Sequence, residues 1–330
     1  MTSHDNNRRT VVARGFALIA LILLGFVYIA PTWWVSLKAP QYPEAAFPQG
    51  IRIHFHMDGV FNGCQKIESH EKQEDEALNC KHEMDAINHF VGMYPIAAGG
   101  PVERVLSPFA FSMMGLMIVV FMLPGRRLRA GVMAAGGIVI GGWMTMAMYT
   151  EGGVHLLSPN YLYDVVTTMD LEPEDYETWT GVETVKESYE EALGRYFRDM
   201  DVIERRSYLM LNATHIGYGV LLAALAVLAV GLWKTRFMYW MLPVVPAALP
   251  VLFVIDYAAW LWWFGHSLHE MGAFTLKPFM PTVLGQGKVA QFYTYSYPHY
   301  GYGLLVGISL CLILAALLRR KQVRESGEDV

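Results

Sequence analysis

The histidines are the residues of this chain most able to do chemistry, and they are distributed unevenly. The sequence has 11 histidines, and all but His4 fall on one side of the membrane topology predicted below. The others lie in loops, at the ends of predicted spans or just inside one: His54, His56, His70, His82, His89, His155, His215, His266, His269 and His299. Histidine is the commonest metal ligand and also binds haem iron. The distribution therefore predicts a metal or haem site at this outer face, although outer loops also hold most of the loop residues and would collect histidines by chance.

The segment HEMDAINHFVGMYPI offers one pair of metal ligands. In a helix, His82, Asp85 and His89 share a face, and Met93 follows His89 by four residues. Thioether sulfur selects Cu(I), and imidazole suits either copper state. We therefore predict that His89 and Met93 bind copper together with a third ligand. The alternative is structural, with Asn88 and His89 tying the loop to the span ends by hydrogen bonds.

The segment IRIHFHM predicts a short β-strand. Its apolar residues occupy alternate positions, with Arg52, His54 and His56 between them. The two histidines would point the same way, as a chelating pair does. The alternative is a half-buried strand with a polar outer face. Together with His82, these histidines complete the predicted set of metal ligands.

A second hypothesis is a b-type haem held between spans. His215, His266 and His299 are the candidate axial ligands, and two of them would have to face each other across the bundle. The motif HSLHE also gives His266, His269 and Glu270 the spacing of a chelating group on a helix. The alternative there is a polar helix end that reaches toward water.

Asp256 is the one acidic residue deep inside a predicted span. A carboxylate in lipid is costly, so it is usually paired or functional. We predict that Asp256 is buried and paired with His215, which lies at a similar depth in the preceding span.

The composition predicts a membrane protein. The 330 residues are 54% hydrophobic and only 17% charged, and crossing the hydrocarbon takes about 20 apolar residues. We predict an all-α integral membrane protein with six transmembrane helices. The predicted spans are residues 12–36, 106–124, 131–149, 208–233, 237–265 and 299–318. The first is too long for a signal peptide and should remain as an anchor.

The Lys and Arg residues predict the orientation. They occur at the N-terminus, in the turns around residues 126 and 235, and in the tail, all on one side of a six-span chain. By the positive-inside rule, both termini are cytoplasmic, in a bacterial inner membrane. The predicted order is 1–36 (cytoplasmic N-terminus and first span), 37–105 (periplasmic segment with a short strand), 106–150 (two spans), 151–207 (acidic periplasmic segment), 208–266 (two spans), 267–298 (periplasmic loop) and 299–330 (last span and basic tail).

The outer segments are acidic. Residues 39–105 carry 10 acids against 5 Lys and Arg, and residues 151–207 carry 14 against 5. Nucleic acid is therefore not an expected partner, since phosphates require a basic surface. Periodic apolar positions predict a helix over residues 181–206 that leads into the fourth span, whereas the Pro and Gly density of residues 272–298 predicts a structured loop.

Two of the three cysteines, Cys64 and Cys80, share the first outer segment, and Cys311 lies in the last span. An oxidising compartment favours a disulfide between the first two. The alternative is that both thiols bind metal.

Two segments resemble a known family. They are APQYPEAAFPQGIRIHF followed by DAINHFVGMYPI, and KPFMPTVLGQGKVAQFYTYSYP. They are similar to a poorly characterised family of multi-span bacterial membrane proteins with an "INGLNHYIGM" motif, matched at Asn88, His89, Gly92 and Met93. Members are often encoded beside nitrous oxide reductase and copper-chaperone genes, so the resemblance, over about a quarter of the chain, implies a setting in copper-linked respiration. His54, His56 and the cysteine loop depart from the family pattern.

The sequence thus favours a non-enzymatic inner-membrane protein that handles copper at its periplasmic face, as an accessory to a respiratory or oxidative metalloenzyme. It has no nucleotide-binding, metalloprotease or haem-attachment motif. The alternatives are a b-haem electron-transfer subunit and a structural subunit of a larger membrane complex. Membrane lipid and other membrane or periplasmic subunits are the expected partners.

Overall fold

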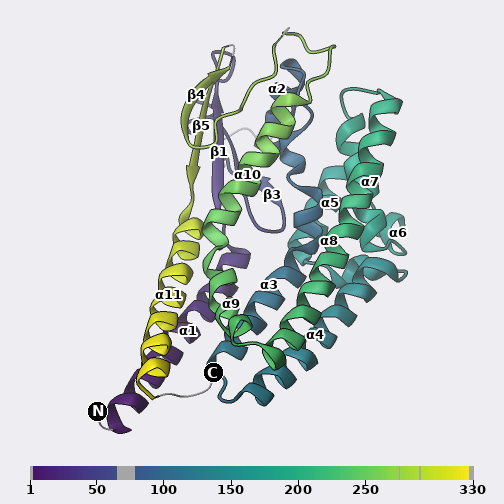
Figure 1. Cartoon of the computed structure of the whole chain (residues 1–330). Coiled ribbons are helices and arrows are strands. Elements are labelled where there is room, and N and C mark those ends of the chain that lie inside the picture. The colour runs from purple at the N-terminus through teal and green to yellow at the C-terminus, as the bar shows by residue number, and fades with distance from the viewer. Residues whose placement is uncertain (1–2, 65–78, 275, 290, 327–330) are drawn as a thin grey trace.

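The protein is a bundle of long helices that carries a small β-sheet at one end, as the computed structural model in Figure 1 shows. The structure describes residues 3–64, 79–274, 276–289 and 291–326. Five helices are long and apolar enough to cross a membrane. They are α1 (Ser3–Ile29), α3 (Pro101–Met122), α4 (Arg126–Tyr149), α8 (Met200–Lys234) and α11 (Tyr300–Ser326). The expectation of a helical membrane protein is confirmed at this level.

A sixth candidate span is bent. Helices α9 (Arg236–Ala247) and α10 (Leu249–His266) are long and apolar enough only when taken together, and they meet at an angle of 58°. Pro243 and Pro246 lie inside α9, where proline removes a backbone hydrogen bond and crowds the preceding turn. The span predicted at residues 237–265 corresponds to this bent pair.

The first helix ends earlier than predicted. α1 stops at Ile29, and Trp33–Lys38 forms strand β1, so the predicted span over residues 12–36 is wrong at its C-terminal end. Pro31, which has no N–H, lies between the two elements. The strand directly follows the apolar helix, and its backbone is satisfied by a neighbouring strand on each edge.

The sheet joins distant parts of the chain. It is antiparallel throughout, in the order β3-β2-β1-β5-β4. Its strands are β1 (Trp33–Lys38), β2 (Ile51–Phe55), β3 (Val60–Asn62), β4 (Gly285–Val289) and β5 (Phe292–Pro298). The strand predicted in IRIHFHM is β2. The third outer segment, predicted as a loop, contributes β4 and β5, because alternating aromatic residues outweigh its Pro and Gly content.

One face of the sheet forms a core with helices. Ile51, Ile53 and Phe55 are buried on that face and pack with residues of α2 (Cys80–Phe90) and α10. Because side chains alternate along a strand, the intervening residues of β2 must lie on the opposite face. That opposite face carries His54 and, one step beyond the strand, His56.

The predicted cysteine pair is confirmed. Cys64, just after β3, is bonded to Cys80 at the start of α2, with their Cα atoms 5.9 Å apart. The bond holds α2 against the sheet. The loop that it closes, which contains His70, lies outside the described residues.

Short helices fill the end of the bundle beside the sheet. They are η1 (Ile96–Ala98), η2 (Gly153–Leu156), α5 (Pro159–Met169), α6 (Pro173–Tyr176) and α7 (Gly181–Gly194). The continuous helix predicted over residues 181–206 is wrong, because α7 ends at Gly194 and α8 begins only at Met200, capped by Asp199. With 35 residues, α8 is ~52 Å long, longer than the ~30 Å hydrocarbon layer, so one end of it extends beyond the membrane.

A buried ion-pair cluster connects these elements. The Asp164 carboxylate of α5 accepts hydrogen bonds from Lys81 of α2 and Arg104 of α3. Its side chain is 4% exposed, and the two cationic side chains are 13% and 12% exposed. Burial lowers the pKa of Lys81, and the neighbouring Asp164 opposes that shift. The sequence does not single out this cluster, because Asp164 is one of 14 acids in residues 151–207 and its three members lie far apart along the chain.

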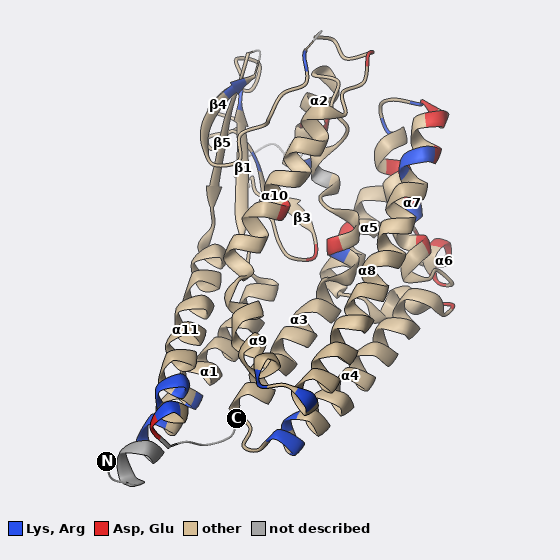
Figure 2. Ribbon diagram, viewed as in Figure 1, with Lys and Arg blue, Asp and Glu red and all other residues tan. Residues whose placement is uncertain are grey.

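Lys and Arg residues with few acidic residues among them gather at the end of the bundle that lies away from the sheet, whereas both signs of charge occur elsewhere (Figure 2). We call this the basic end. It comprises Arg8, Arg9, Arg14, Arg126, Arg127, Arg129, Lys234, Arg236, Arg319, Arg320, Lys321 and Arg324. The sheet and helices α2 and α5–α7 lie at the opposite end, which we call the sheet end (Figure 1).

We predict that Asp164→Asn destabilises the protein. The substitution leaves Lys81 and Arg104 buried without their carboxylate, and breaking a buried pair in this way typically costs about 3–5 kcal/mol. Unfolding of the detergent-solubilised protein by heat or denaturant measures the change. The matched control is Glu187→Gln, which removes a partly exposed partner of Lys186 and should cost at most about 1 kcal/mol. Equal stability of the two variants would contradict a structural role for the cluster.

Candidate metal centre

Three histidines come together where the sheet joins the membrane helices. His54 lies on β2, His56 just beyond it, and His299 between β5 and α11. The ring centroids of His54 and His299 are 5.0 Å apart, and His56 is close enough to His299 to interact with it electrostatically. His299, which the sequence offered as a candidate haem ligand, thus lies close to the predicted pair His54 and His56.

The register of the strands explains why these three histidines lie close together. Trp33 of β1 pairs with Phe55 on one side and with Pro298 on the other. The ladder continues one step further, because Thr32 N–H donates to Phe55 O at 2.8 Å and His299 N–H donates to Thr32 O at 3.0 Å. Residues 54–56 and 299 are therefore held at the same end of the sheet, on the two strands that flank β1.

The His56 ring lies beside the backbone of Ile29, the last residue of α1, which hydrogen-bonds with it. Its Nδ1 atom is buried and has no hydrogen-bond partner among the described residues. In the tautomer that carries its proton on Nε2, this buried Nδ1 offers a lone pair to a metal ion. Metal-binding histidines normally coordinate through one ring nitrogen while an oxygen holds the N–H of the other.

His54 and His299 present the neighbouring nitrogens. His54 Nε2 is also buried without a partner among the described residues. His299 Nδ1 accepts a hydrogen bond from the N–H of Tyr300 at 2.9 Å, so coordination through His299 would require its ring to turn. Across the described residues, no three His, Cys, Asp or Glu side chains are already arranged around one ion position.

All three imidazoles are held neutral at pH 7. Burial is the main reason why the pKa of both His54 and His56 falls to about 4. The nearby charge of Arg52 lowers the pKa of His54 further, and His299 lowers that of His56 further. Burial and Arg52 also lower the pKa of His299. Neutral imidazole is the form that binds a metal.

The predicted pair of His89 and Met93 is not brought together. α2 ends at Phe90, and Gly92 adopts a φ of +78°, so the helical spacing on which the pair depended does not continue. Met93 is buried and lines a small apolar cavity beside the sheet, whereas the His89 ring stacks on Tyr196 at 4.8 Å.

The INHFVGM segment instead forms a turn that backbone hydrogen bonds connect to the segment after α10. Asn88 O accepts from the N–H of Met93 at 2.8 Å, and Gly92 O accepts from the N–H of His269 at 2.7 Å. A Cβ on Gly92 would lie 2.7 Å from His269 O, so only glycine allows this approach. The expected tie between the loop and a span end thus exists, but backbone atoms make it and the side chains of Asn88 and His89 do not.

His82, Asp85 and His89 do not form a site. His82 is exposed on α2. Asp85 is buried and lies 3.7 Å from the guanidinium of Arg195. Its carboxylate is thus turned toward a cation and not toward the two histidines.

The three candidate haem ligands also lie apart from one another. His215 Nδ1 bonds to the hydroxyl of Tyr149 at 2.7 Å, and His266 stacks on Trp262 of its own helix. His299 contacts His54. Among the described residues, the structure therefore brings no two of the three haem candidates face to face.

The predicted pairing of Asp256 with His215 is wrong. Asp256 is half-buried on α10 and hydrogen-bonds with the side chain of Glu103, in the first turn of α3. Both carboxyl groups line a cavity of about 110 Å³ that also borders His56 and Arg104. The reason is the bend before α10, which directs this helix along the sheet, while His215 of α8 faces α4.

Comparison with protein-family models, with curated proteins and with solved structures gave no match. The interpretation of the site therefore rests on its own geometry.

We predict that the metal-free protein loses stability as the pH falls from about 6.5 to about 4. The unfolded histidines take up protons near their ordinary pKa of 6.5, whereas folded His54 and His56 resist protonation until about pH 4. Stability falls wherever the unfolded state binds more protons. The groups that shift their pKa values by charge are Arg52 and His299, with Asp164 acting on His56. Glu103, Arg104 and Asp256 border the same cavity as His56.

The measurement is the melting temperature of chelator-treated protein at a series of pH values. The double variant His54→Asn/His56→Asn should show a shallower loss over this range than the wild type. The exposed His155→Asn variant is the control and should keep the wild-type slope. Identical slopes in all three proteins would contradict the lowered pKa values of His54 and His56.

Proposed function

We propose that this protein handles copper at the sheet end, as a non-catalytic accessory of a respiratory or oxidative metalloenzyme in a bacterial inner membrane. The observation that carries the proposal is the His56 side chain, whose Nδ1 is buried without a hydrogen-bond partner among the described residues, close to His54, whose Nε2 is also buried without one. A buried polar atom without a partner costs about 1–3 kcal/mol. A bound ion would remove that cost.

The ligand set is compatible with copper. His54 Nε2 and His56 Nδ1 are the primary ligands, and His299 can join after its ring turns. Imidazole suits copper and zinc alike, and two or three imidazoles are fewer than the four protein ligands of a closed structural zinc site. The resemblance of the INHFVGM segment to a family from copper-linked gene clusters supports copper, by analogy. Because His89 and Met93 are not brought together, we do not propose them as ligands of one ion.

A site of this kind can receive and release an ion. Two or three neutral imidazoles bind without the closed cage of a structural site, and they lie at the junction between sheet and membrane helices. A periplasmic or membrane partner that carries copper is therefore the proposed companion, with lipid around the spans.

Copper titration of the detergent-purified protein tests the proposal. The wild type should bind Cu(I) in competition with a chromophoric chelator, and His56→Ala should weaken the affinity at least about tenfold, the lower limit for losing a well-oriented ligand or its support. His89→Ala/Met93→Ala is the matched control, and it should bind as the wild type does.

Two outcomes would contradict the proposal. Equal Cu(I) affinity of the wild type and His56→Ala would mean that this site does not exist. A haem absorbance band in the purified protein, lost with His215→Ala or His266→Ala, would favour the electron-transfer hypothesis instead.

We further propose that the basic end is cytoplasmic and the sheet end periplasmic. The positive-inside rule supports this orientation. The Cys64–Cys80 bond at the sheet end supports it independently, because such bonds persist in oxidising compartments.

Labelling with a membrane-impermeant maleimide tests the orientation. In intact spheroplasts, the Cys80→Ser variant should label at Cys64 without lysis. An Arg127→Cys substitution, at an exposed position of the basic end, should label only after lysis when made in a Cys64→Ser/Cys80→Ser background. The reverse pattern would overturn the proposed orientation.

A further inference from the structure

A cavity of about 60 Å³ lies between helices α2 and α10 and the face of the sheet that packs on them. Most of the side chains that line it are apolar. They include Ile53 of β2, Met84 of α2, Leu261 of α10 and Met93 of the INHFVGM segment. Asn88, near the end of α2, also borders the cavity. One carboxamide is therefore placed in the wall of an otherwise largely apolar cavity.

Asn88 is buried without a partner for its amide group. The residue is 4% exposed, and its Nδ2 atom makes no hydrogen bond among the described residues. The turn that follows Asn88 is held by its backbone oxygen, which accepts from the N–H of Met93, so the turn does not account for the side chain. Leaving a buried donor unsatisfied is costly, and an apolar side chain of similar shape avoids that cost.

The other polar side chains that border the cavity are paired. The hydroxyls of Thr282 and Thr294 hydrogen-bond with each other at 3.0 Å, and the Tyr257 hydroxyl hydrogen-bonds with Ser296 Oγ at 3.1 Å. A buried water needs about two to four polar partners, and this wall offers a single unpaired donor among the described residues. A molecule that is mostly apolar and carries one acceptor fits the wall better than water does.

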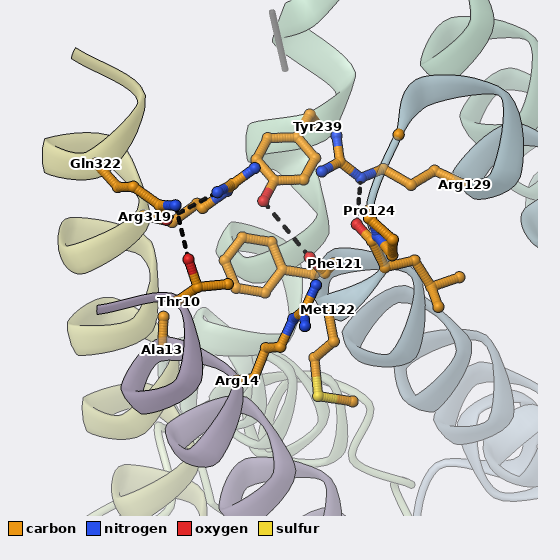
Figure 3. A pocket seen from close by; sticks show the side chains of 12 residues that line it. Thr10, Ala13, Arg14, Phe121, Met122, Pro124, Arg129, Tyr239, Arg319 and Gln322 are labelled. Atoms are coloured by element: carbon orange, nitrogen blue, oxygen red, sulfur yellow. Dashed lines mark hydrogen bonds between the residues drawn. The ribbon is translucent and has the colours of Figure 1, made fainter. Parts of the chain in front are cut away.

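The larger cavity at the basic end, of about 320 Å³, has a different character (Figure 3). Its polar side chains already bond to one another, because Arg319 donates to Gln322 at 2.7 Å and Gln322 donates to Thr10 at 2.6 Å. These groups do not require a ligand. The unpaired amide thus distinguishes the smaller cavity from the larger one.

The size and lining of the smaller cavity limit what can bind there. A water-sized group occupies about 10–15 Å³ of such a cavity, so 60 Å³ has room for about four to six of these groups. No Asp, Glu, Lys, Arg or His side chain borders it among the described residues, and a buried charge without a partner is strongly disfavoured. The flexible thioethers of Met84 and Met93 can adapt to the shape of a ligand.

We propose that this cavity binds a small uncharged organic molecule with one oxygen that accepts a hydrogen bond from Asn88 Nδ2. Short-chain ketones and other small carbonyl compounds are the matching class, with their carbon atoms against the apolar wall. The site is independent of the copper proposal and of the orientation of the chain.

The methyl groups of Met84 and Met93 allow a direct test. Protein labelled with carbon-13 at its methionine methyls is titrated in detergent with butanone, and the methyl resonances are followed by nuclear magnetic resonance. The resonances of Met84 and Met93, assigned from the spectra of Met84→Leu and Met93→Leu, should shift and saturate. Met146, which is 55% exposed on α4, reports on general partitioning and should show no saturable shift. No saturable shift at either cavity methionine would overturn the proposal.

The matched variant is Asn88→Leu, which removes the carboxamide at nearly constant volume. It should bind butanone about two- to tenfold more weakly, the range for losing one uncharged hydrogen bond. In the absence of ligand it should melt at a higher temperature than the wild type, because no unpaired donor remains. The alkene 2-methylbut-1-ene, which has the shape of butanone without its oxygen, should bind the wild type and Asn88→Leu equally.

A second variant, Val289→Phe, fills the cavity from its partly exposed side on β4 and should abolish the saturable shifts. Shifts that persist in this variant would place binding elsewhere and overturn the site. Equal affinity of butanone for the wild type and Asn88→Leu would leave an apolar cavity only and overturn the role of the amide. A lower melting temperature of ligand-free Asn88→Leu would show that the carboxamide has a structural partner, which also contradicts the proposal.

Discussion

The structure depends on one long-range hydrogen-bonded ladder that joins the beginning of the chain to its end. Strand β1 follows α1 and strand β5 precedes α11, and the ladder between them runs on into the helix junction, where Gly301 N–H donates to Pro31 O at 3.0 Å. A Cβ on Gly301 would lie 2.5 Å from that oxygen, so the approach requires glycine there. The sheet is consequently a rigid extension of two membrane helices, and it places His299 against His54.

The ladder alone does not fix the sheet against the remaining helices. That role falls to the Cys64–Cys80 bond, which attaches α2 to the sheet, and to Asp164, which connects α2 with α3 and α5. Buried ion pairs contribute little net stability but tolerate loss of one partner badly. The cluster therefore selects a single arrangement of α2, α3 and α5 at the sheet end.

The sequence predicted the parts of this fold that depend on local composition. Hydropathy located the helices, lysine and arginine marked one end of the bundle, and alternation identified β2 with His54 and His56 on one face. The rest depends on pairing between distant segments. Trp33–Lys38 is apolar enough to read as the end of a span, and only its partner Phe292–Pro298 makes it a strand.

The same distinction separates the predicted site residues that the fold brings together from those that it keeps apart. The pair on β2 follows from strand periodicity, which holds over short distances, whereas His89 and Met93 relied on a helix that Gly92 ends. The partners of Asp256 and His299 come from remote elements, Glu103 and His54. The alternation in FYTYSYP, directly before His299, is the one signal that could have placed it at the sheet.

The central claim is that imidazoles of the sheet end bind copper, and X-ray absorption spectroscopy of the Cu(I)-loaded protein tests it most directly. A first shell of two or three nitrogen atoms, with the outer-shell scattering typical of imidazole, is the predicted result. It should be absent from His54→Ala/His56→Ala protein treated in the same way. A first shell that contains sulfur would contradict the claim, because it would place the ion at a methionine or cysteine and not at His54 and His56.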